Sequence, residues 1–210
     1  MRKFEFTGGT KMIEICPKCG NHEWDKEITG DKICCPKCGE EWNFISMPLF
    51  ILTGCSGVGK TTTAIEIVRK KVDYAVLDAD ILTWYVDWNN EEICNDWVEM
   101  ILNLTKDINQ SGKPVLWTMA GCIDRLPKAY NSRYFSEIKC LALVCDDEAL
   151  RKRMQEGRGI TDENWLKGSS DYNRYFMEHD SFGDVRFDKV DITDKTPQEV
   201  ADYVIDWMKY

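Results

Sequence analysis

The sequence has no segment that would cross a membrane. Its apolar runs, PLFILTG at 48–54 and CLALVC at 140–145, are far shorter than the ~20 apolar residues of a transmembrane helix. The basic residues in the opening MRKFEFTGGTK are not followed by an apolar stretch, so no signal peptide is predicted. We therefore expect a soluble cytoplasmic protein without a membrane partner.

The sequence also lacks an excess of positive charge. It has 27 Lys and Arg against 36 Asp and Glu, which gives a net charge of -9 and a pI of about 4.9. Proteins that bind nucleic acid usually carry a basic patch or a high pI. The charge therefore argues against a nucleic-acid partner and favours a small-molecule substrate, although it does not exclude a local basic groove.

Turn residues and cysteines divide the 210-residue chain into two predicted modules. Residues 1–46 hold both CPKCG knuckles and are too short to bury a large core, so this segment needs a staple such as a metal ion. Residues 47–210 alternate strand-like and helix-like patterns, which predicts an α/β domain with a parallel sheet between helices.

The first module is predicted to be a zinc ribbon. Cys16 and Cys19 form one pair, Cys35 and Cys38 form the other, and fifteen residues separate the pairs. This is the spacing of a four-cysteine zinc site, and iron in a rubredoxin-like site is the alternative. Cys34 would give a longer spacing, so Cys35 is the predicted ligand. The module has seven Lys and Arg against eight Asp and Glu, which favours a structural role, protein contact or self-association over nucleic-acid binding.

The second module is predicted to run from an apolar strand to a closing helix. The expected strands are 48–54, 74–80, 114–120, 138–145 and 186–194. The expected helical segments are 60–71, 91–112, 124–136, 146–157, 162–179 and 196–210.

The segment GCSGVGKT at 54–61 is a complete Gly-x-x-x-x-Gly-Lys-Thr, the P-loop or Walker A motif. It follows an apolar strand and opens a helix, which is the context that phosphate binding requires. We expect Lys60 to reach the β- and γ-phosphates of ATP and the Thr61 hydroxyl to bind Mg²⁺. The predicted nucleotide-binding residues are Gly54, Cys55, Ser56, Gly57, Val58, Gly59, Lys60, Thr61 and Thr62.

The chain has no Asn-Lys-x-Asp element for guanine, which argues against a GTPase, and an acidic pair follows the second strand in LDAD at 77–80. Together with the P-loop and LRKRMQEGR at 150–158, this pattern resembles the shikimate, gluconate and adenylylsulfate kinases and chloramphenicol phosphotransferase. The resemblance covers roughly residues 48–210. It implies a P-loop fold of five parallel strands and an ATP-dependent phosphotransferase.

By position in that family, Asp80 would orient or deprotonate the acceptor hydroxyl, and Asp78 would hold the Mg²⁺ water shell or the substrate. Arg153 and Arg158, with Arg151 as a further candidate, would form a lid over the phosphates. Phosphoryl transfer depends mainly on positioning and charge neutralisation, which suits these groups. Turn or cap chemistry for the carboxylates and a solvated helix face for the arginines are the alternatives.

The acceptor site is predicted from residues that follow the second and third strands. Trp84, Tyr85 and Trp88 could stack on a planar ring, and Arg125 and Arg133 could bind an anionic group. Ordinary core packing is the alternative for the aromatic residues. A nucleoside or nucleotide is the expected acceptor.

Two other functions fit the same motifs. One is a 5′-hydroxyl polynucleotide kinase that grips nucleic acid with its ribbon. The other is a nucleotide-gated interaction module, in which ATP binding only switches a partner surface. Substitution of Asp80 separates the last of these from a kinase, because only a kinase needs this carboxylate for turnover.

Overall fold

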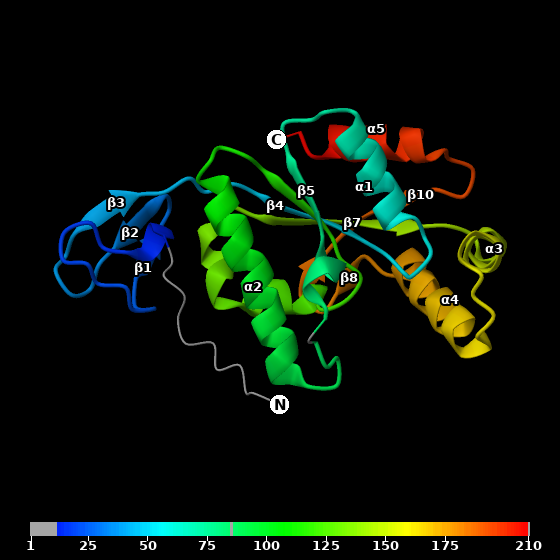
Figure 1. Ribbon diagram of the computed structural model, residues 1–210, viewed down its shortest axis with the longest axis horizontal. Coiled ribbons are helices and arrows are strands. Elements are labelled where there is room, and N and C mark those ends of the chain that lie inside the picture. Colours follow the sequence, from blue (N-terminus) through cyan, green and yellow to red (C-terminus); the bar gives the residue numbers. More distant parts are fainter. Residues whose placement is uncertain (1–11, 85, 210) are drawn as a thin grey trace.

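The computed structural model describes residues 12–84 and 86–209. Its centre is a five-stranded parallel sheet of order β10-β7-β4-β6-β5 (Figure 1). The strands are β4 (Leu49–Thr53), β5 (Ala75–Asp78), β6 (Val115–Thr118), β7 (Ile138–Val144) and β10 (Asp188–Asp191). The predicted α/β architecture with five parallel strands is confirmed.

Helices cover both faces of this sheet. They are α1 (Lys60–Arg69), α2 (Glu91–Asn109), α3 (Asp147–Arg158), α4 (Glu163–Glu178) and α5 (Pro197–Trp207). Within the described part of the chain, no helix has both the length and the apolar character to cross a membrane.

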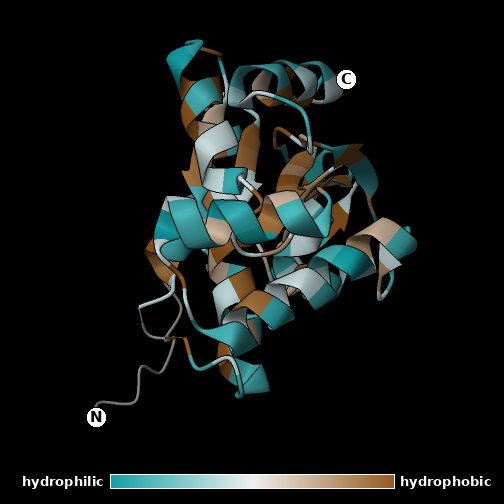
Figure 2. Ribbon diagram, turned by 90° about the vertical axis from the view of Figure 1, so that its right-hand side faces the viewer, coloured by the Kyte–Doolittle hydropathy of each residue, from teal (hydrophilic) through white to brown (hydrophobic). Residues whose placement is uncertain are grey.

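The side chains of β4 show how the sheet builds two cores. Leu49 and Ile51 pack into a cluster with the buried face of α2. Phe50 and Leu52 pack into a second cluster with residues of α1, α3 and α5. Successive side chains of a strand point to opposite faces, so a strand that is covered on both sides is apolar throughout. Figure 2 shows hydrophobic residues gathered on the strands and on the inward faces of the helices.

Two predicted elements differ from the structure. The helical segment expected at 124–136 consists of two 3-10 helices, η3 (Ile123–Lys128) and η4 (Tyr130–Tyr134). Pro127 lies inside η3, and its missing N–H and fixed ring disfavour a continuous α-helix. The strand expected at 186–194 is divided between β9 (Val185–Arg186) and β10, because β9 turns back to form a hairpin with β8 (Ser181–Phe182).

The amino-terminal module forms a small antiparallel sheet. The 3-10 helix η1 (Met12–Glu14) precedes β1 (Glu27–Thr29), β2 (Lys32–Cys34) and β3 (Glu41–Asn43), which pair in the order β1-β2-β3. Its buried Ile33 and Phe44 share a cluster with Tyr134 of η4, and the backbone N–H of Ile45 donates to the Gln110 side chain after α2 (2.9 Å). The module therefore packs directly on the larger domain.

The position of this module is decided by the direction of the strands. It lies where β4 begins, and the P-loop lies where β4 ends, so the two occupy opposite edges of the parallel sheet (Figure 1). Five strand residues at about 3.3 Å each separate these edges by roughly 17 Å.

Candidate active site and metal centre

The P-loop connects β4 to α1. At two of its positions only glycine fits, because the backbone has a positive φ and neighbouring atoms leave no room for a Cβ. Gly54 has φ +132°, and a Cβ there would lie 2.6 Å from the Leu143 carbonyl oxygen. Gly57 has φ +81°, and its Cβ would lie 2.4 Å from a carbon of Met154. Left-handed backbone and absent side chains let the loop wrap inward. No side chain caps the N-terminus of α1, which leaves its N–H groups available to an anion.

Lys60 is folded back over the loop. Its Nζ donates to the carbonyl oxygens of Gly54 (2.8 Å) and Cys55 (2.9 Å). Burial lowers the pKa of this ammonium, while the carboxylates of Asp80 and Asp78 act in the opposite direction. The lysine is thus held beside the phosphate cradle, where a triphosphate would offer stronger acceptors than two carbonyls.

The first helical turn and the end of β5 bring two oxygen ligands together. The Thr61 hydroxyl donates to Asp78 Oδ2 (3.1 Å), and the other carboxylate oxygen accepts from the Asp80 backbone N–H (3.1 Å). A hydroxyl and a carboxylate are hard oxygen donors of the kind that Mg²⁺ prefers. The residues therefore fit the cation that would accompany ATP, with Asp80 exposed one turn further on.

The two predicted lid arginines both contact the nucleotide side of the site. Arg158 donates to the P-loop Ser56 hydroxyl (3.2 Å). Arg153 donates to the carbonyl oxygens of Val58 (3.4 Å) and Ile192 (2.9 Å). Arg151 instead forms ion pairs with Asp147 and Glu163 on the helix surface.

A cavity of about 1110 Å³ joins these groups. Besides the predicted P-loop, carboxylate and arginine residues, it is lined by side chains that sequence reasoning missed. Those used below are Thr118, Ala120, Ile192, Lys195 and Pro197. Several follow the carboxyl ends of β6 and β10, where ligands bind in open parallel sheets, so strand direction was the signal that could have found them.

The residues predicted to hold the acceptor are only partly brought together. Trp84 follows Asp80 on the chain and is 78% exposed, whereas Tyr85 lies outside the described residues. Arg125 is not among the residues that line the cavity; it donates to Asn95 Oδ1 (2.6 Å) and to the Glu91 carbonyl.

Arg133 is further removed from the site. Its guanidinium donates to the Lys26 carbonyl oxygen in the amino-terminal module (2.7 Å) and stacks on the Tyr130 ring (3.7 Å to the centroid). Its role in this structure is thus at the module interface, because η4 packs at the amino edge of the sheet.

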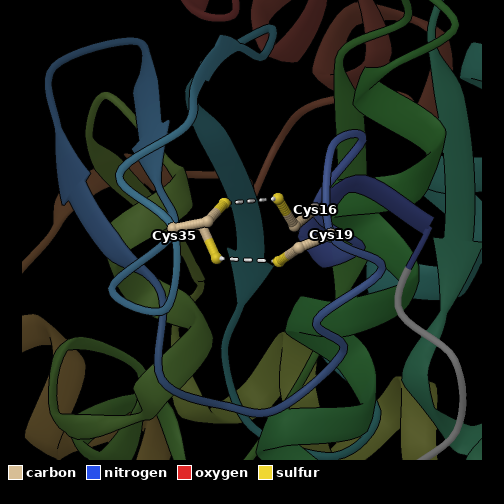
Figure 3. Close-up of side chains that lie close together, drawn as sticks. Cys16, Cys19 and Cys35 are labelled. Carbon is tan, nitrogen blue, oxygen red and sulfur yellow. Dashed lines mark hydrogen bonds between the residues drawn. The ribbon is translucent and has the colours of Figure 1, made fainter.

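The four knuckle cysteines converge on one point, as the spacing predicts. Their sulfur atoms all lie within 4.8 Å of one another, with Cys16 to Cys38 at 3.6 Å and Cys19 to Cys35 at 3.7 Å (Figure 3). A tetrahedral zinc with Zn–S distances of about 2.3 Å would hold its sulfurs about 3.8 Å apart. The cluster therefore fits zinc closely, and Cys34 lies outside it.

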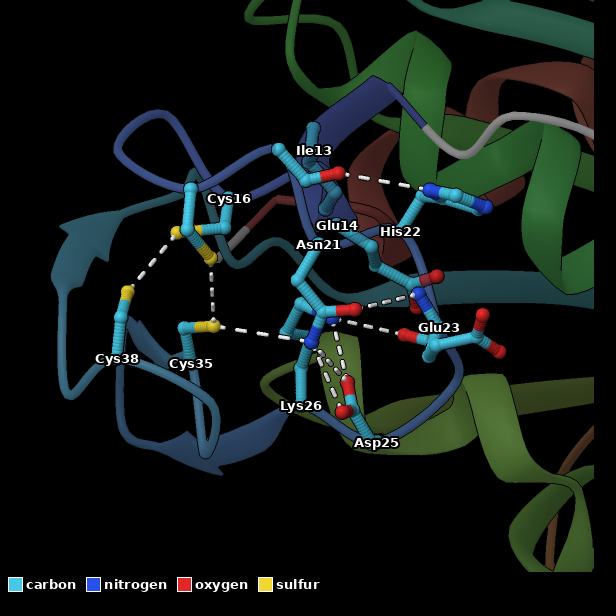
Figure 4. Close-up of polar contacts among 12 residues, drawn as sticks. Ile13, Glu14, Cys16, Asn21, His22, Glu23, Asp25, Lys26, Cys35 and Cys38 are labelled. Carbon is cyan, nitrogen blue, oxygen red and sulfur yellow. Dashed lines mark hydrogen bonds and ion pairs between the residues drawn. The ribbon is translucent and has the colours of Figure 1, made fainter.

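A second layer of contacts surrounds this cluster. Asn21 donates from Nδ2 to Cys35 Sγ (3.7 Å) and to both oxygens of Asp25, and buried Lys26 contacts Asp25 in turn (Figure 4). Such outer contacts fix the orientation of metal ligands.

A buried ion pair ties the module to α2. Lys106 Nζ lies 3.3 Å from Glu14 Oε1, with side-chain exposures of 0% and 1%. Lys106 also donates to Asn131 Oδ1 (3.1 Å), and the Tyr134 hydroxyl donates to Glu14. Glu14 is two residues before Cys16, so this ion pair connects the cysteine cluster closely to the larger domain.

Comparison with solved structures identifies the fold. The chain is similar to a sugar kinase from Janibacter sp. HTCC2649, with TM-score 0.57, 16% identity and coverage of 78% of this chain and 94% of that one. It is also similar to a gluconokinase from Sinorhizobium meliloti 1021, with TM-score 0.53, 15% identity and coverage of 79% and 92%. A shikimate kinase from Acinetobacter baumannii, solved with shikimate, gives TM-score 0.50, 17% identity and coverage of 79% and 94%.

No family model and no curated protein sequence matches the chain. At these identities the likeness establishes the fold of the small P-loop kinases, as the sequence motifs predict.

Proposed function

We propose that this protein is an ATP-dependent kinase that transfers the γ-phosphoryl group of Mg-ATP to a hydroxyl or phosphate of a small-molecule acceptor, with a nucleoside or nucleotide as the first candidate. The observation that carries the proposal is the meeting of Lys60, Thr61 and Asp78 at one cavity, with Asp80 beside them. Phosphoryl transfer needs positioning and charge neutralisation more than covalent chemistry, and these groups supply both.

Each residue has a proposed part in the reaction. The P-loop amides and Lys60 bind the β- and γ-phosphates, and Thr61 and Asp78 would hold Mg²⁺, which neutralises phosphate charge when bound. Arg153 and Arg158 close over the phosphates and exclude water. The Asp80 carboxylate accepts the hydrogen bond of the acceptor hydroxyl and takes its proton as the new O–P bond forms and the bond to the ADP oxygen breaks.

The amino-terminal module, residues 1–46, has a different proposed role from the kinase domain, residues 47–210. We place zinc at Cys16, Cys19, Cys35 and Cys38 and assign the module a structural role, with protein contact or self-association as its further use. Its location at the edge opposite the P-loop argues against the polynucleotide kinase alternative, since a strand gripped there would lie roughly 17 Å of sheet from the phosphates. A cytoplasmic location accords with reduced zinc thiolates and an ATP supply.

The test is ADP formation from Mg-ATP with a panel of nucleosides, nucleotides, sugars, hydroxy acids and 5′-hydroxyl oligonucleotides. We expect one small-molecule class to stimulate turnover, and Asp80→Asn to lower kcat by roughly 10²–10⁴-fold, the usual contribution of a general base, while the Kd for ATP stays within about twofold. Asp87→Asn, an exposed carboxylate in the same segment that lies outside the cavity, is the control. Tight ATP binding without stimulation by any acceptor would contradict the kinase and favour the interaction module.

A further inference from the structure

The cations of the cavity all lie on its nucleotide side. Four cationic side chains line it in the described part of the chain: Lys60, Arg153, Arg158 and Lys195. The first three donate to the P-loop or to the segment after β10, as described above. Lys195 belongs to the connection between β10 and α5, beside Ile192 and Pro197. In the proposed complex these groups would face the triphosphate of ATP, which would occupy them.

Among the described residues, the ends of β5 and β6 bring carboxylates but no cationic side chain to the cavity. Asp78 and Asp80 line it at the end of β5, and Thr118 and Ala120 line it at the end of β6. The two arginines predicted to bind an anionic group are engaged elsewhere, Arg125 with Asn95 and Arg133 with the Lys26 carbonyl. A phosphate or carboxylate on the acceptor would therefore meet like charges without a partner, which is unfavourable in a partly desolvated site.

Large apolar side chains are exposed in the chain segment that follows these carboxylates, although they are not among the residues that line the cavity. Ile81, Trp84 and Trp88 all lie within the eight residues after Asp80. Their exposed fractions are 59% for Ile81, 78% for Trp84 and 52% for Trp88. Trp88 is held edge-on against buried Trp97, with ring centroids 5.2 Å apart. Exposed tryptophans in a segment that begins at the cavity offer flat surfaces on which a planar ring can stack.

Resting on the proposed kinase function, we propose that the acceptor is an uncharged hydroxyl compound with a planar ring, of which a nucleoside is the simplest case, and not a nucleotide or a hydroxy acid. The acceptor hydroxyl attacks the γ-phosphorus, its proton passes to Asp80, and ADP leaves with the bridging oxygen. The ring stacks on Trp84, and the described residues at the ends of β5 and β6 supply no cation for a second anion.

Matched acceptor pairs test the charge. We would compare kcat/KM for nucleosides with that for their 5′-monophosphates, and for neutral sugars with that for their acids. We expect the uncharged member to be preferred by at least about tenfold, which corresponds to 1.4 kcal/mol. Preference for the anionic member would overturn this inference and leave the kinase intact, whereas no turnover with any acceptor would remove both.

A charge-gain variant sharpens the test. Ala120 is exposed at the acceptor side, and its role in the structure is through its backbone carbonyl, which accepts from the Tyr172 hydroxyl (2.7 Å). We expect Ala120→Lys to lower KM for the nucleoside monophosphate by about tenfold relative to Ala120→Gln, because it supplies the missing cation. An equal KM in both variants would show that anions are excluded for another reason and would overturn the charge argument.

The stacking argument has its own variant. Trp84→Ala is expected to raise KM for the nucleoside by roughly 5–100-fold, the range for loss of one base–aromatic contact, with KM for ATP unchanged and partial rescue in Trp84→Phe. The control is Trp24→Ala, at a half-exposed tryptophan of the amino-terminal module. It should change neither KM for the nucleoside nor KM for ATP. An unchanged acceptor KM in Trp84→Ala would remove the planar ring from the proposal.

Discussion

The two edges of the central sheet treat charged side chains in opposite ways. At the amino edge, Lys106 and Glu14 are completely buried and paired with each other. At the carboxyl edge, Lys60 and Arg153 bond to backbone carbonyls and Asp80 is exposed. Paired buried charges fix two bodies in one arrangement, whereas cations on weak carbonyl acceptors can be recruited by a stronger anion. The amino edge is therefore organised for rigidity and the carboxyl edge for ligands.

Metal removal should have the largest effect and should act on the amino edge. Because a segment this small has little core of its own, loss of the ion is expected to unfold it and to lower Tm more than any substitution below; structural zinc is worth on the order of 10 kcal/mol in isolated fingers. Thermal unfolding with and without chelator measures the effect, and metal analysis distinguishes zinc from iron. Cys34→Ser should respond like the unmodified protein. A Tm that chelator does not change would contradict a structural site.

Breaking the buried ion pair should come next. Lys106→Met leaves Glu14 buried without its cation, and we expect the free energy of unfolding to fall by about 3–5 kcal/mol, with KM for ATP within twofold because the P-loop is at the other edge. Lys32→Met removes an exposed pair with Glu41 and should cost less than about 1 kcal/mol. If both variants lost the same free energy of unfolding, the buried pair would stabilise the protein no more than the exposed pair, and the prediction would be wrong.

The corresponding lysine of the carboxyl edge should show the reverse behaviour. Lys60→Met is expected to lower kcat/KM by roughly 10²–10³-fold, the usual cost of one preorganised donor at developing charge. Tm should be nearly unchanged, since only two hydrogen bonds to carbonyls are lost. Lys113→Met, at an exposed surface pair with Asp73, is the control for both measurements. Strong destabilisation by Lys60→Met would contradict the division between the edges.

The smallest expected effect concerns pH and the wall of the nucleotide site. Hydrogen bonds from the Thr193 side chain and backbone lower the pKa of Asp191. A lowered folded pKa stabilises the protein above the ordinary value of 3.8, and this contribution is lost as pH falls through the folded pKa. Between pH 6 and pH 3, the free energy of unfolding measured by denaturant titration should therefore fall less for the Asp191→Asn variant than for the unmodified protein. Parallel losses would show that Asp191 does not contribute.

Much of the site could be predicted because its chemistry is local in sequence. The P-loop holds its glycines, lysine and threonine within eight residues, and each cysteine knuckle holds two ligands within four. Asp78 and Asp80 could be placed because a parallel strand ends there. Local spacing fixes such groups whatever the rest of the chain does.

Other positions could not be predicted because distant residues decide them. Arg133 follows the third strand of the domain, but η4 carries it to the interface with Lys26, 107 positions away. The helix expected at 124–136 is interrupted at Pro127, and η4 is held by Glu99 of α2, which accepts from the backbone N–H groups of Tyr130 and Asn131. Neither partner is visible in a short window of sequence.

The sequence by itself determined the P-loop, the acidic pair, the cysteine cluster and the alternation that makes a parallel sheet, because each depends on residues that are close along the chain. Only the tertiary structure decided that the cysteine module sits at the edge opposite the P-loop, that Lys106 and Glu14 join the two parts, and that Arg125 and Arg133 find their partners away from the cavity. These features depend on strand direction and on which polar groups find partners when the chain packs. The physical reason is that a buried charge must be paired, and only the fold decides which residue is close enough to pair with it.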